Sequence, residues 1–355
     1  MAPVPESVLR ALSLPADPSK ASISTAGLGS GFTSTGSIRA RVPSADGHGE
    51  EERCYFIKSA SDGKASEEMF RGEFESLNAI ATAVPGLCPR PLAWGRLDEK
   101  SDRSWFLATQ YLDLGRYHVM GGRSDKRNSL PQRLGKLHST PAPPCPDTGT
   151  RKFGFPVPTF CGDTKQVNTF NGSWADFYAH ERLMSILEAS EKQNGKDKSL
   201  RTLVEKTAFT VVPALLGDDH LGYDKNGNGE GVTPVVVHGD LWSGNAGHGK
   251  ISRSGRKEDE QPGDVIYDPS ACYAHSEYDL GIMKMFGGFG SAFFKEYHQI
   301  VPKTEPVAEY EDRIRLYELY HHLNHHAIFA GGYRSGAVSI MQSLIRKYGD
   351  KSDRL

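Results

Sequence analysis

The pattern of apolar and polar positions divides this chain into a β-rich first part and a largely helical remainder. Between residues 20 and 110, short runs of β-forming residues, such as residues 54–58, alternate with polar turns rich in Gly, Ser and Thr. Residues 66–83 are the exception, because apolar residues recur there at the three-to-four spacing of an amphipathic helix. The first part is therefore predicted to be a small sheet with one helix.

The second part is predicted to consist mainly of helices. Apolar periodicity indicates them at residues 129–139, 174–190, 198–208, 278–286, 293–300, 308–331 and 337–348. Two regions break this pattern: residues 141–170 predict a long ordered loop, and residues 247–263 predict a polar surface loop at the tip between two strands. We therefore expect an α+β fold of two lobes, with an N-lobe at residues 1–110 and a C-lobe at residues 111–355.

Composition and charge narrow the functional classes. The chain has 355 residues, of which 37% are hydrophobic and 24% are charged, as is ordinary for a globular enzyme. A formal net charge of −2 gives no general attraction to nucleic acid or to an anionic membrane, and no apolar run approaches the roughly 18 residues of a membrane span. Five scattered cysteines without a Cys-x-x-Cys pair favour free thiols in a reducing cytoplasm. Neither nucleic acid nor a membrane is expected as a partner, and a monomer and a homodimer are both compatible with this pattern.

Asp240 and Asn245 form the most informative chemical pattern in the chain. They lie in the run 238–245, directly after the apolar residues 235–237, which predict a short buried strand. Asp268 follows a second apolar run. An Asp, an Asn five positions later and a further Asp after a strand are typical of kinase-like phosphotransferases. There, one carboxylate orients the attacking hydroxyl and accepts its proton, while the amide oxygen and the second carboxylate hold magnesium beside the nucleotide phosphates. The pattern therefore predicts phosphotransfer with ATP and Mg²⁺.

The first part of the chain offers residues that would hold the nucleotide. Lys58, at the end of a strand, is the candidate contact for the α- and β-phosphates, and Glu73, in the following helix, is its candidate partner. Glu68 and Glu75 lie on the same predicted helix and compete with Glu73 for this role. A solvated surface lysine is the alternative interpretation of Lys58 taken alone.

Two further segments are candidate nucleotide contacts. One is a Gly-x-Gly-x-Gly turn, whose backbone N–H groups could approach a phosphate closely because glycine lacks a Cβ. The other lies at the end of the first part, where the backbone could read adenine. The residues are Gly27, Gly29, Ser30 and Gly31 in the turn, and Gln110 and Tyr111 in the second segment. A flexible hairpin tip is the alternative interpretation of the turn.

The segment around Asp240 resembles the signature of the fructosamine/ketosamine 3-kinase family. It reads Val-His-Gly-Asp-Leu-Trp-Ser-Gly-Asn at residues 237–245. Other segments that resemble this family lie at residues 69–73, 153–155, 166–168, 267–269, 285–289 and 323–325. The resemblance runs from about residue 20 to the end of the chain. The Trp-Ser-Gly within the signature separates this family from aminoglycoside and choline kinases, which share the Asp and Asn framework.

The resemblance implies a protein-kinase-like two-lobe fold, related to those of aminoglycoside phosphotransferases and choline kinases. It implies ATP-dependent phosphorylation of the sugar 3-hydroxyl of ketosamines, with ketosamine small molecules and glycated proteins as substrates. Breakdown of the 3-phosphate would then release the amine, which amounts to deglycation. Carried to the matching positions, the family's roles make Asp240 the catalytic base, Asn245 and Asp268 the magnesium ligands, Lys58 the phosphate contact and Glu73 its partner.

The sugar site is the least determined part of the prediction. Trp242, Trp174 and His238 are its candidates. The two tryptophans fit a core equally well, and the resemblance implies that His238 braces the catalytic loop. A metal-binding spacing of i and i+4 also occurs on one predicted helix, but no acidic or Cys ligand cluster accompanies it, so a packed helix is favoured. The histidines concerned are His321, His322, His325 and His326.

Two other functional classes stay open at this point. A kinase of another small molecule, such as an aminoglycoside or an amino alcohol, would use the same framework with an acidic substrate pocket. A non-catalytic nucleotide-binding scaffold would normally lack Lys58, Asp240 or Asp268, and all three are present.

Overall fold

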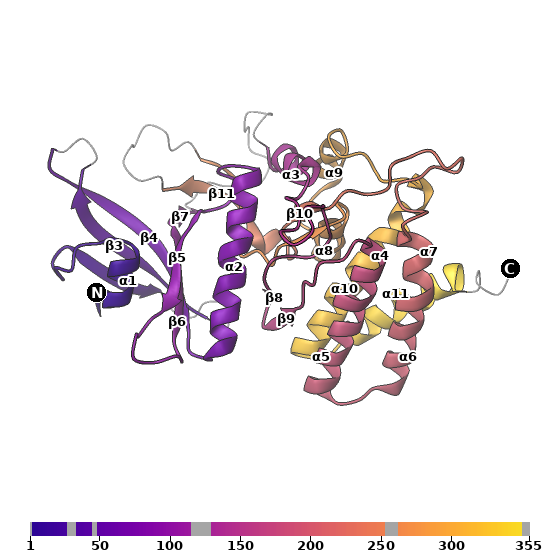
Figure 1. Ribbon diagram of the computed structural model, residues 1–355, viewed down its shortest axis with the longest axis horizontal. Coiled ribbons are helices and arrows are strands. Elements are labelled where there is room, and N and C mark those ends of the chain that lie inside the picture. Colours follow the sequence, from indigo (N-terminus) through magenta and orange to yellow (C-terminus); the bar gives the residue numbers. More distant parts are fainter. Residues whose placement is uncertain (1, 27–32, 45–47, 115–128, 253–261, 350–355) are drawn as a thin grey trace. The chain divides into compact units, whose positions relative to one another are not determined.

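The computed structural model describes residues 2–26, 33–44, 48–114, 129–252 and 262–349. The chain forms two compact units (Figure 1). Unit 1 comprises Met1–Leu130 and Ala246–Asp268, and unit 2 comprises Pro131–Asn245 and Pro269–Leu355. The chain therefore passes from unit 1 to unit 2, returns to unit 1 for one segment, and then completes unit 2.

Unit 1 is built around a six-stranded antiparallel sheet in the order β1-β2-β3-β4-β6-β5 (Figure 1). Its strands are β1 (Ala2–Pro3), β2 (Ala21–Ala26), β3 (Ser34–Pro43), β4 (Glu50–Ala60), β5 (Pro91–Arg96) and β6 (Trp105–Gln110). A short helix, α1 (Glu6–Ala11), precedes β2, and its Val8 packs in one apolar core with Ile38, Ile57 and Phe106 of the sheet. The strand predicted at residues 54–58 is confirmed as part of β4.

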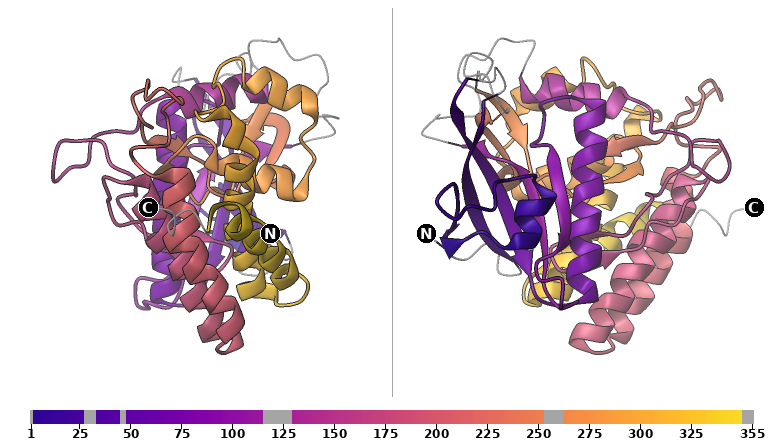
Figure 2. Two further views of the ribbon diagram at one scale, coloured as in Figure 1. Left: turned by 90° about the vertical axis from the view of Figure 1, so that its right-hand side faces the viewer. Right: turned by 60° about the vertical axis from the view of Figure 1, so that its left-hand side comes forward.

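The helix predicted at residues 66–83 is confirmed as α2 (Lys64–Ala83), which packs against β5 and β6 (Figure 1, Figure 2). Phe70, Leu77 and Ile80 on this helix are at most 2% exposed. Burying each of these side chains contributes roughly 1.5–3 kcal/mol, so the apolar face holds the helix to the sheet. The same helix carries Glu73, whose place in unit 1 is fixed in this way.

A three-stranded sheet, β12-β11-β7, brings a distant part of the sequence into unit 1. It consists of β7 (Leu112–Asp113), β11 (Ala246–Ile251) and β12 (Gly263–Ile266). The loop predicted at residues 247–263 is wrong at its start, because backbone pairing with β7 and β12 makes residues 247–251 part of β11. Its expected place between two strands is confirmed by the pairing of β11 with β12. Residues 253–261 of this loop lie outside the described residues. A Cβ at Gly249 would lie 2.6 Å from the carbonyl oxygen of Asp113, so the close approach of β11 to β7 requires glycine. This pairing also extends unit 1 beyond residue 110, where the N-lobe was predicted to end.

Unit 2 is mainly helical, and its long helices lie where the sequence predicts them, with ends shifted by a few residues (Figure 2). The helical segments are α3 (Leu130–Ser139), α4 (Trp174–Phe177), η2 (Tyr178–Met184), α5 (Ser185–Asn194), α6 (Lys198–Lys206), η3 (Thr207–Val211), α7 (Val212–Leu216), η4 (Ser243–Asn245), α8 (Tyr278–Phe286), α9 (Ser291–Tyr297), η6 (Val307–Glu309), α10 (Tyr310–Phe329) and α11 (Tyr333–Tyr348). Of these, η2 and η3 are π-helical, and η4 and η6 are short 3-10 helices. Helix α10 packs against α5, α8 and α11 and so forms the centre of the helical bundle.

Two short strand pairs complete unit 2. Strand β10 (Val235–Val237) pairs with β13 (Cys272–Ala274), and β8 (Thr159–Cys161) pairs with β9 (Thr164–Gln166). The β8-β9 hairpin corrects the prediction of a loop throughout residues 141–170. Its two-residue turn begins at Gly162 with φ of +67°, which is typical of hairpin turns that have Gly in the first central position.

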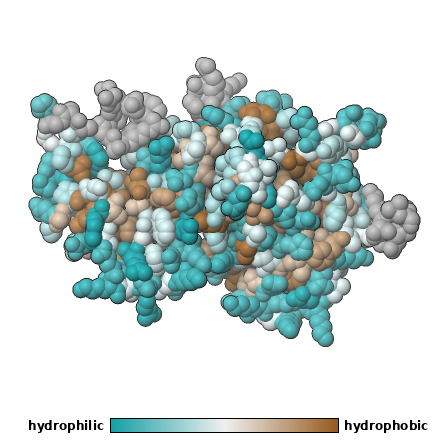
Figure 3. Space-filling view, in the orientation of Figure 1, coloured by the Kyte–Doolittle hydropathy of each residue, from teal (hydrophilic) through white to brown (hydrophobic). Residues whose placement is uncertain are grey.

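The face of the molecule shown in Figure 3 is mostly hydrophilic, with small apolar areas between polar ones. Among the described residues, no helix combines the length and the apolar character that a membrane crossing needs. Two large apolar side chains of unit 2, Trp242 and Phe286, are 41% and 39% exposed, and their rings lie 5.9 Å apart. These two rings form an exposed aromatic pair, and its member Trp242 lies between Asp240 and Asn245 in the sequence.

Candidate active site

Unit 1 brings together Lys58, Glu73 and Asp268. The Lys58 ammonium lies 2.7 Å from Glu73 Oε1 and 2.7 Å from Asp268 Oδ1. Strand β4 supplies the lysine, α2 supplies Glu73, and Asp268 follows β12. The lysine is only 9% exposed, so it is not the solvated surface lysine of the alternative interpretation. Glu73, rather than Glu68 or Glu75, is the partner of Lys58 on the helix.

Mutual charge stabilises this cluster. Burial alone would lower the pKa of Lys58, but the carboxylates of Asp268 and Glu73 outweigh burial and raise that pKa above its ordinary value. Burial raises the pKa of Glu73, and the Lys58 ammonium opposes this shift. One ammonium therefore faces two carboxylates, which is an arrangement that a further cation would complete.

Asp268 has a left-handed backbone conformation, with φ of +57°. Few residues other than glycine adopt this conformation, Asp and Asn more readily than most, and such strain is concentrated at functional sites. The Asp268 side chain is 44% exposed even though its carboxylate is paired with Lys58. Asp268 is thus the exposed member of the cluster and the one that a bound cation could reach.

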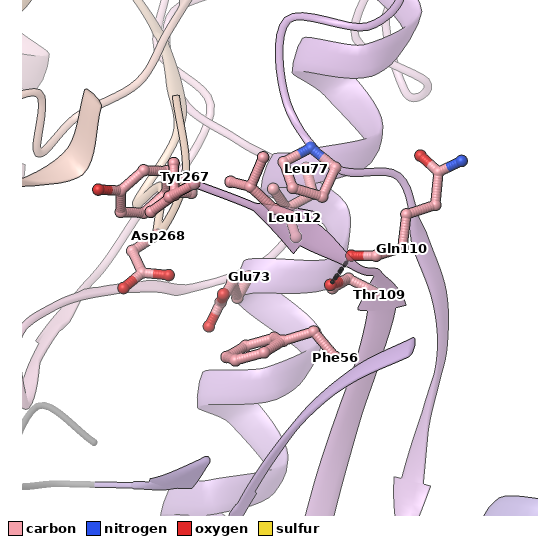
Figure 4. Close-up of a pocket in the computed structure, with 10 residues that line it drawn as sticks. Phe56, Glu73, Leu77, Thr109, Gln110, Leu112, Tyr267 and Asp268 are labelled. Carbon is pink, nitrogen blue, oxygen red and sulfur yellow. Dashed lines mark hydrogen bonds between the residues drawn. The ribbon is translucent and has the colours of Figure 1, made fainter. Parts of the chain in front are cut away.

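A cavity of ≈ 240 Å³ lies beside this cluster within unit 1 (Figure 4). It is lined by Phe56, Glu73, Leu77, Pro89, Thr109, Gln110, Leu112, Leu114, Tyr267 and Asp268. Sites for drug-sized ligands occupy about 300–1,000 Å³, so this cavity is of the size for a flat ring rather than for a whole nucleotide. Its lining combines apolar side chains for the faces of a ring with two neighbouring carboxylates, those of Glu73 and Asp268 (Figure 4).

The backbone segment predicted to read adenine borders this cavity at Gln110. The Gln110 N–H donates to the Arg90 carbonyl at 2.9 Å, and the Gln110 side-chain oxygen accepts from the Arg90 N–H at 2.9 Å. The Gln110 carbonyl accepts from the Thr109 hydroxyl (Figure 4), and the Tyr111 carbonyl accepts from the N–H of Ser252. A carbonyl oxygen can accept a second hydrogen bond, so an adenine amino group at this edge would use that remaining capacity.

The predicted phosphate-binding turn lies outside the described residues. It comprises Gly27, Gly29, Ser30 and Gly31. The strands on either side, β2 and β3, pair antiparallel, with Ala26 opposite Thr35. This pairing agrees with the β-rich character predicted for residues 20–110, and phosphate contact by the turn stays a prediction.

Unit 2 places Asp240 and Asn245 on one loop, which we call the catalytic loop (residues 238–245), between β10 and the end of η4. The Asn245 side-chain nitrogen donates to the Asp240 carbonyl oxygen at 2.9 Å and to the Asp240 carboxylate at 3.3 Å. The Asn245 N–H donates to the carbonyl of Trp242 at 2.9 Å and closes the turn. Because the amide nitrogen of Asn245 faces Asp240, its amide oxygen is the atom suited to bind a cation.

A fully buried carboxylate, Asp279, holds the start of the catalytic loop. It accepts hydrogen bonds from the backbone N–H groups of His238 and Gly239, both at 2.8 Å, and from His138 Nε2 at 3.0 Å. Burial alone would raise the pKa of Asp279, but His138 and the hydrogen bonds outweigh burial and lower that pKa. The sequence pattern did not assign this role to Asp279, which lies in the first turn of α8.

His238 braces the catalytic loop, as the family resemblance implies. Its ring nitrogen Nδ1 accepts a hydrogen bond from the Asp240 N–H at 3.2 Å, and the residue is 0% exposed. His238 therefore has no surface for a sugar, which corrects its prediction as a substrate contact. Gly239 is required beside it, because φ is +84° and a Cβ would lie 2.0 Å from the Ser270 carbonyl oxygen.

The two candidate tryptophans of the sugar site differ in exposure. Trp174 is 0% exposed, its Nε1 donates to the Tyr317 hydroxyl at 2.9 Å, and its ring stacks on that of Phe177. It is a core residue of unit 2, and this corrects its prediction as a sugar contact. Trp242 is 41% exposed and packs over Gly244, where a Cβ would lie 2.1 Å from the ring. Trp242 remains a candidate for the wall of the sugar site.

The histidines with metal-binding spacing lie on the packed helix α10, as the sequence favoured. His325 Nδ1 is hydrogen-bonded to the His321 carbonyl at 2.8 Å. His321 is 0% exposed, and burial lowers the pKa of its ring to about 3. It lies beside Cys161 and Asp240, a grouping that no sequence spacing indicated because the three residues belong to distant segments.

Comparison with known proteins identifies the family. The family model for fructosamine kinase matches residues 19–347. The chain belongs to the fructosamine kinase family. A ketosamine-3-kinase of Mus musculus is 32% identical to this family member over 81% of the present chain and 87% of its own. A chloroplastic protein-ribulosamine 3-kinase of Arabidopsis thaliana is 30% identical over 93% of the present chain and 88% of its own.

A solved structure confirms the fold of this fructosamine kinase family member. A candidate fructosamine-3-kinase from Thermobifida fusca is similar with a TM-score of 0.68 and 23% identity, covering 97% of this chain and 98% of that one. The predicted α+β, kinase-like fold is therefore confirmed. The β-rich part corresponds to unit 1, and the mainly helical part corresponds to unit 2.

Proposed function

We propose that this chain is an ATP-dependent kinase of the sugar 3-hydroxyl of ketosamines. The observation that supports it most is the pairing of Lys58 with both Glu73 and Asp268 at 2.7 Å. A kinase-like phosphotransferase needs such a lysine–glutamate pair and an aspartate for the metal. The substrate class follows from the family, whose relatives in mouse and Arabidopsis are named for ketosamine and protein-ribulosamine. The acceptors are therefore ketosamine small molecules and ketosamines on glycated proteins, and loss of the 3-phosphate by elimination completes deglycation.

Unit 1 binds the nucleotide in this proposal. The base occupies the cavity of ≈ 240 Å³, where the carbonyl of the lining residue Gln110 accepts a hydrogen bond from the adenine amino group. Tyr111, the next residue in the chain, is the second candidate contact for adenine. The Lys58 ammonium donates to the α- and β-phosphates, and Glu73 keeps it in place. The Asp268 carboxylate, which Lys58 contacts, would hold the magnesium ion that accompanies the nucleotide.

Unit 2 activates the acceptor. The Asp240 carboxylate accepts the proton of the sugar 3-hydroxyl as that oxygen bonds to the γ-phosphorus, and the bond from the γ-phosphorus to the β–γ bridging oxygen breaks to release ADP. Asn245 orients the carboxylate through its 3.3 Å hydrogen bond, and Asp279 and His238 fix the loop. A base that is already oriented needs little reorganisation during the reaction.

The donor set fits Mg²⁺. Magnesium prefers hard oxygen ligands and keeps several waters, so one or two protein oxygens beside the phosphates suffice. Asp268 offers an exposed carboxylate, and Asn245 offers an amide oxygen. Bound magnesium would offset the negative charge that develops on the transferred phosphoryl group.

The cysteines support a reducing compartment. All five are free thiols, and four of them are buried. Disulfides form and persist in oxidising environments, so this pattern fits a cytoplasmic enzyme, which is the location that we propose.

The test is ADP release with magnesium-ATP and a panel of acceptors. Fructosyl-lysine and a ribulosamine of lysine are expected to give turnover, and free lysine, choline and kanamycin are expected to give none. The Asp240→Asn protein serves as the blank. Turnover with kanamycin or choline alone would preserve the phosphotransferase chemistry and overturn the ketosamine assignment. ATP binding without turnover on any acceptor would favour a non-catalytic scaffold.

A further inference from the structure

Three metal-binding side chains converge in unit 2 next to the catalytic loop. They are Cys161 at the end of β8, Asp240 after β10 and His321 on α10, and one ligand atom of each lies within 4.8 Å of the others. Cys161 is 1% exposed and His321 is 0% exposed, whereas Asp240 is half-buried. Within the described part of the chain, neither ring nitrogen of His321 has a hydrogen-bond partner. Buried polar atoms without partners are rare, so these nitrogens point to a missing ligand.

The three side chains differ from the magnesium ligands in their chemistry. Thiolate and imidazole ligands select borderline and soft cations, whereas magnesium takes oxygen. Tetrahedral zinc, with bonds of about 2.0–2.3 Å, keeps its ligand atoms about 3.4–3.6 Å apart. A separation of at most 4.8 Å therefore closes onto the ion with side-chain movements of roughly 1 Å. We propose that Cys161, Asp240 and His321 form a binding site for Zn²⁺ that is distinct from the magnesium site.

The charges balance in this site. A thiolate and a carboxylate neutralise the two charges of Zn²⁺, and a neutral imidazole adds none, so the buried complex carries no net charge. Without the ion, the Cys161 thiol keeps its proton, because burial and the Asp240 carboxylate raise its pKa well above the ordinary value. Binding therefore forms the sulfur–zinc bond and releases that proton to solvent.

The neighbours of Cys161 suit a ligand held in place. Asn324 Nδ2 donates to Cys161 Sγ at 3.3 Å and to the Cys161 carbonyl at 3.2 Å. The buried guanidinium of Arg182 lowers the pKa of the same thiol, although burial dominates. Such surrounding donors orient metal ligands and stabilise the thiolate form. Three protein ligands leave the fourth position of a tetrahedral zinc ion free. Because Asp240 is only half-buried, water or a substrate hydroxyl could reach that position.

This site gives zinc a defined effect on the enzyme, which rests on the proposed function. A zinc ion on the Asp240 carboxylate occupies the lone pair that would accept the proton of the sugar hydroxyl. Zinc is therefore an inhibitor that acts on the base, whereas magnesium serves the phosphates. Because zinc binding needs no turnover, the site itself can be tested without any kinase assay.

The first test is a titration of the full chain with Co²⁺, which takes the place of Zn²⁺ and is coloured. A thiolate-to-cobalt charge-transfer band is expected in the near ultraviolet for the wild type. Cys161→Ser, which is close to isosteric, is expected to lose the band, and His321→Asn is expected to weaken binding on the order of 100-fold. The matched controls are Cys54→Ser, a thiol of unit 1, and His325→Asn, one turn along α10, and both are expected to keep the band. Absence of the band in the wild type, or its survival in Cys161→Ser, would overturn the site.

The second test measures zinc inhibition at constant magnesium-ATP. Cys161→Ser is expected to need roughly 100-fold more zinc than the wild type for half inhibition, relative to its own uninhibited rate. Equal inhibition of both proteins would place zinc at the nucleotide and overturn the inhibitory role. If cobalt binds through Cys161 but zinc leaves turnover unchanged, the metal site is confirmed. The same result would refute the role of Asp240 as the base. A wild type without any kinase activity would refute the proposed function, while the cobalt spectrum would still decide the metal site.

Discussion

The two units hold their reactive groups by different means. In unit 1, Lys58, Glu73 and Asp268 are held by mutual charge, and one of the three is substantially exposed. In unit 2, Asp240 is held through the backbone of its loop, which is bound to the fully buried Asp279. Charges that hold one another can exchange partners when a further charged group binds, as the proposed function requires for phosphates and a metal ion. A loop bonded to a buried carboxylate cannot rearrange in this way, and such a fixed position suits the role of proton acceptor that we propose for Asp240.

Removing the base should have the largest effect and should separate the two units. Asp240→Asn is expected to lower turnover by about 10²–10⁴-fold, because an amide cannot accept the hydroxyl proton. ATP binding, which depends on unit 1 in this proposal, should stay within about threefold of the wild type. ADP release and calorimetric ATP binding measure the two quantities. Turnover close to that of the wild type would show that Asp240 is not the base.

Weakening the anchor of the catalytic loop should have the next largest effect. Asp279→Asn puts an amide nitrogen where N–H groups now donate, and it is expected to cost about 1.5–3 kcal/mol of unfolding free energy together with most of the turnover. Asp176→Asn is the matched control, because Asp176 also lies in the first turn of a helix but is exposed. Chemical denaturation measures the difference. Equal stability of the two variants would mean that Asp279 does not hold the loop.

The charge cluster of unit 1 should respond mainly in its affinity for ATP. Glu73→Gln keeps the shape of the side chain but removes its charge, and it is expected to lower kcat/KM for ATP about tenfold, or about 1.4 kcal/mol. Glu75→Gln on the same helix is the control and should stay within about twofold. Steady-state kinetics with varied ATP decide this. A similar loss in both variants would show that the pairing of Lys58 with Glu73 has no special role.

The two tryptophans should show the smallest effects and the clearest contrast. Trp174→Phe is expected to cost about 1 kcal/mol of stability through the lost hydrogen bond to Tyr317, with KM for the ketosamine unchanged. Trp242→Phe keeps an exposed ring and should leave that KM nearly unchanged. Trp242→Ala should raise the KM for the ketosamine about 2- to 13-fold, or about 0.5–1.5 kcal/mol. Thermal unfolding and kinetics with varied ketosamine separate the two outcomes. A raised KM in Trp174→Phe would restore Trp174 as a sugar contact.

Local patterns in the sequence predicted the parts of the molecule that depend on neighbouring residues. Helix α2 and strands β4 and β10 follow from apolar periodicity. The choice of Glu73 over Glu68 and Glu75 as the partner of Lys58 came from the family resemblance, because the spacing alone left the three acids open. A Gly-Asp pair at Gly162 was a readable hairpin signal that was missed, because its short strands have few β-forming residues.

Features that depend on distant contacts could not be predicted in this way. Strand β11 is polar and rich in glycine, and only its backbone pairing with β7 and β12 makes it a strand. Asp279 looks like any acid at the start of a helix until the fold brings the backbone of His238 to it. The grouping of Cys161 and His321 with Asp240 could not be predicted either, because no pattern in the segments of Cys161 and His321 indicates that they lie near Asp240 in the fold.

The return of the chain into unit 1 affects how the nascent chain can fold during synthesis. Strand β7 ends at Asp113, and its partner β11 begins at Ala246. At about 5–20 residues per second, translation leaves β7 without that partner for roughly 7–27 seconds. Unit 1 therefore cannot be completed before most of unit 2 has left the ribosome, although nearly all of its sheet has been synthesised long before. For that interval the edge of β7 is an unpaired strand that chaperones or neighbouring nascent chains can reach.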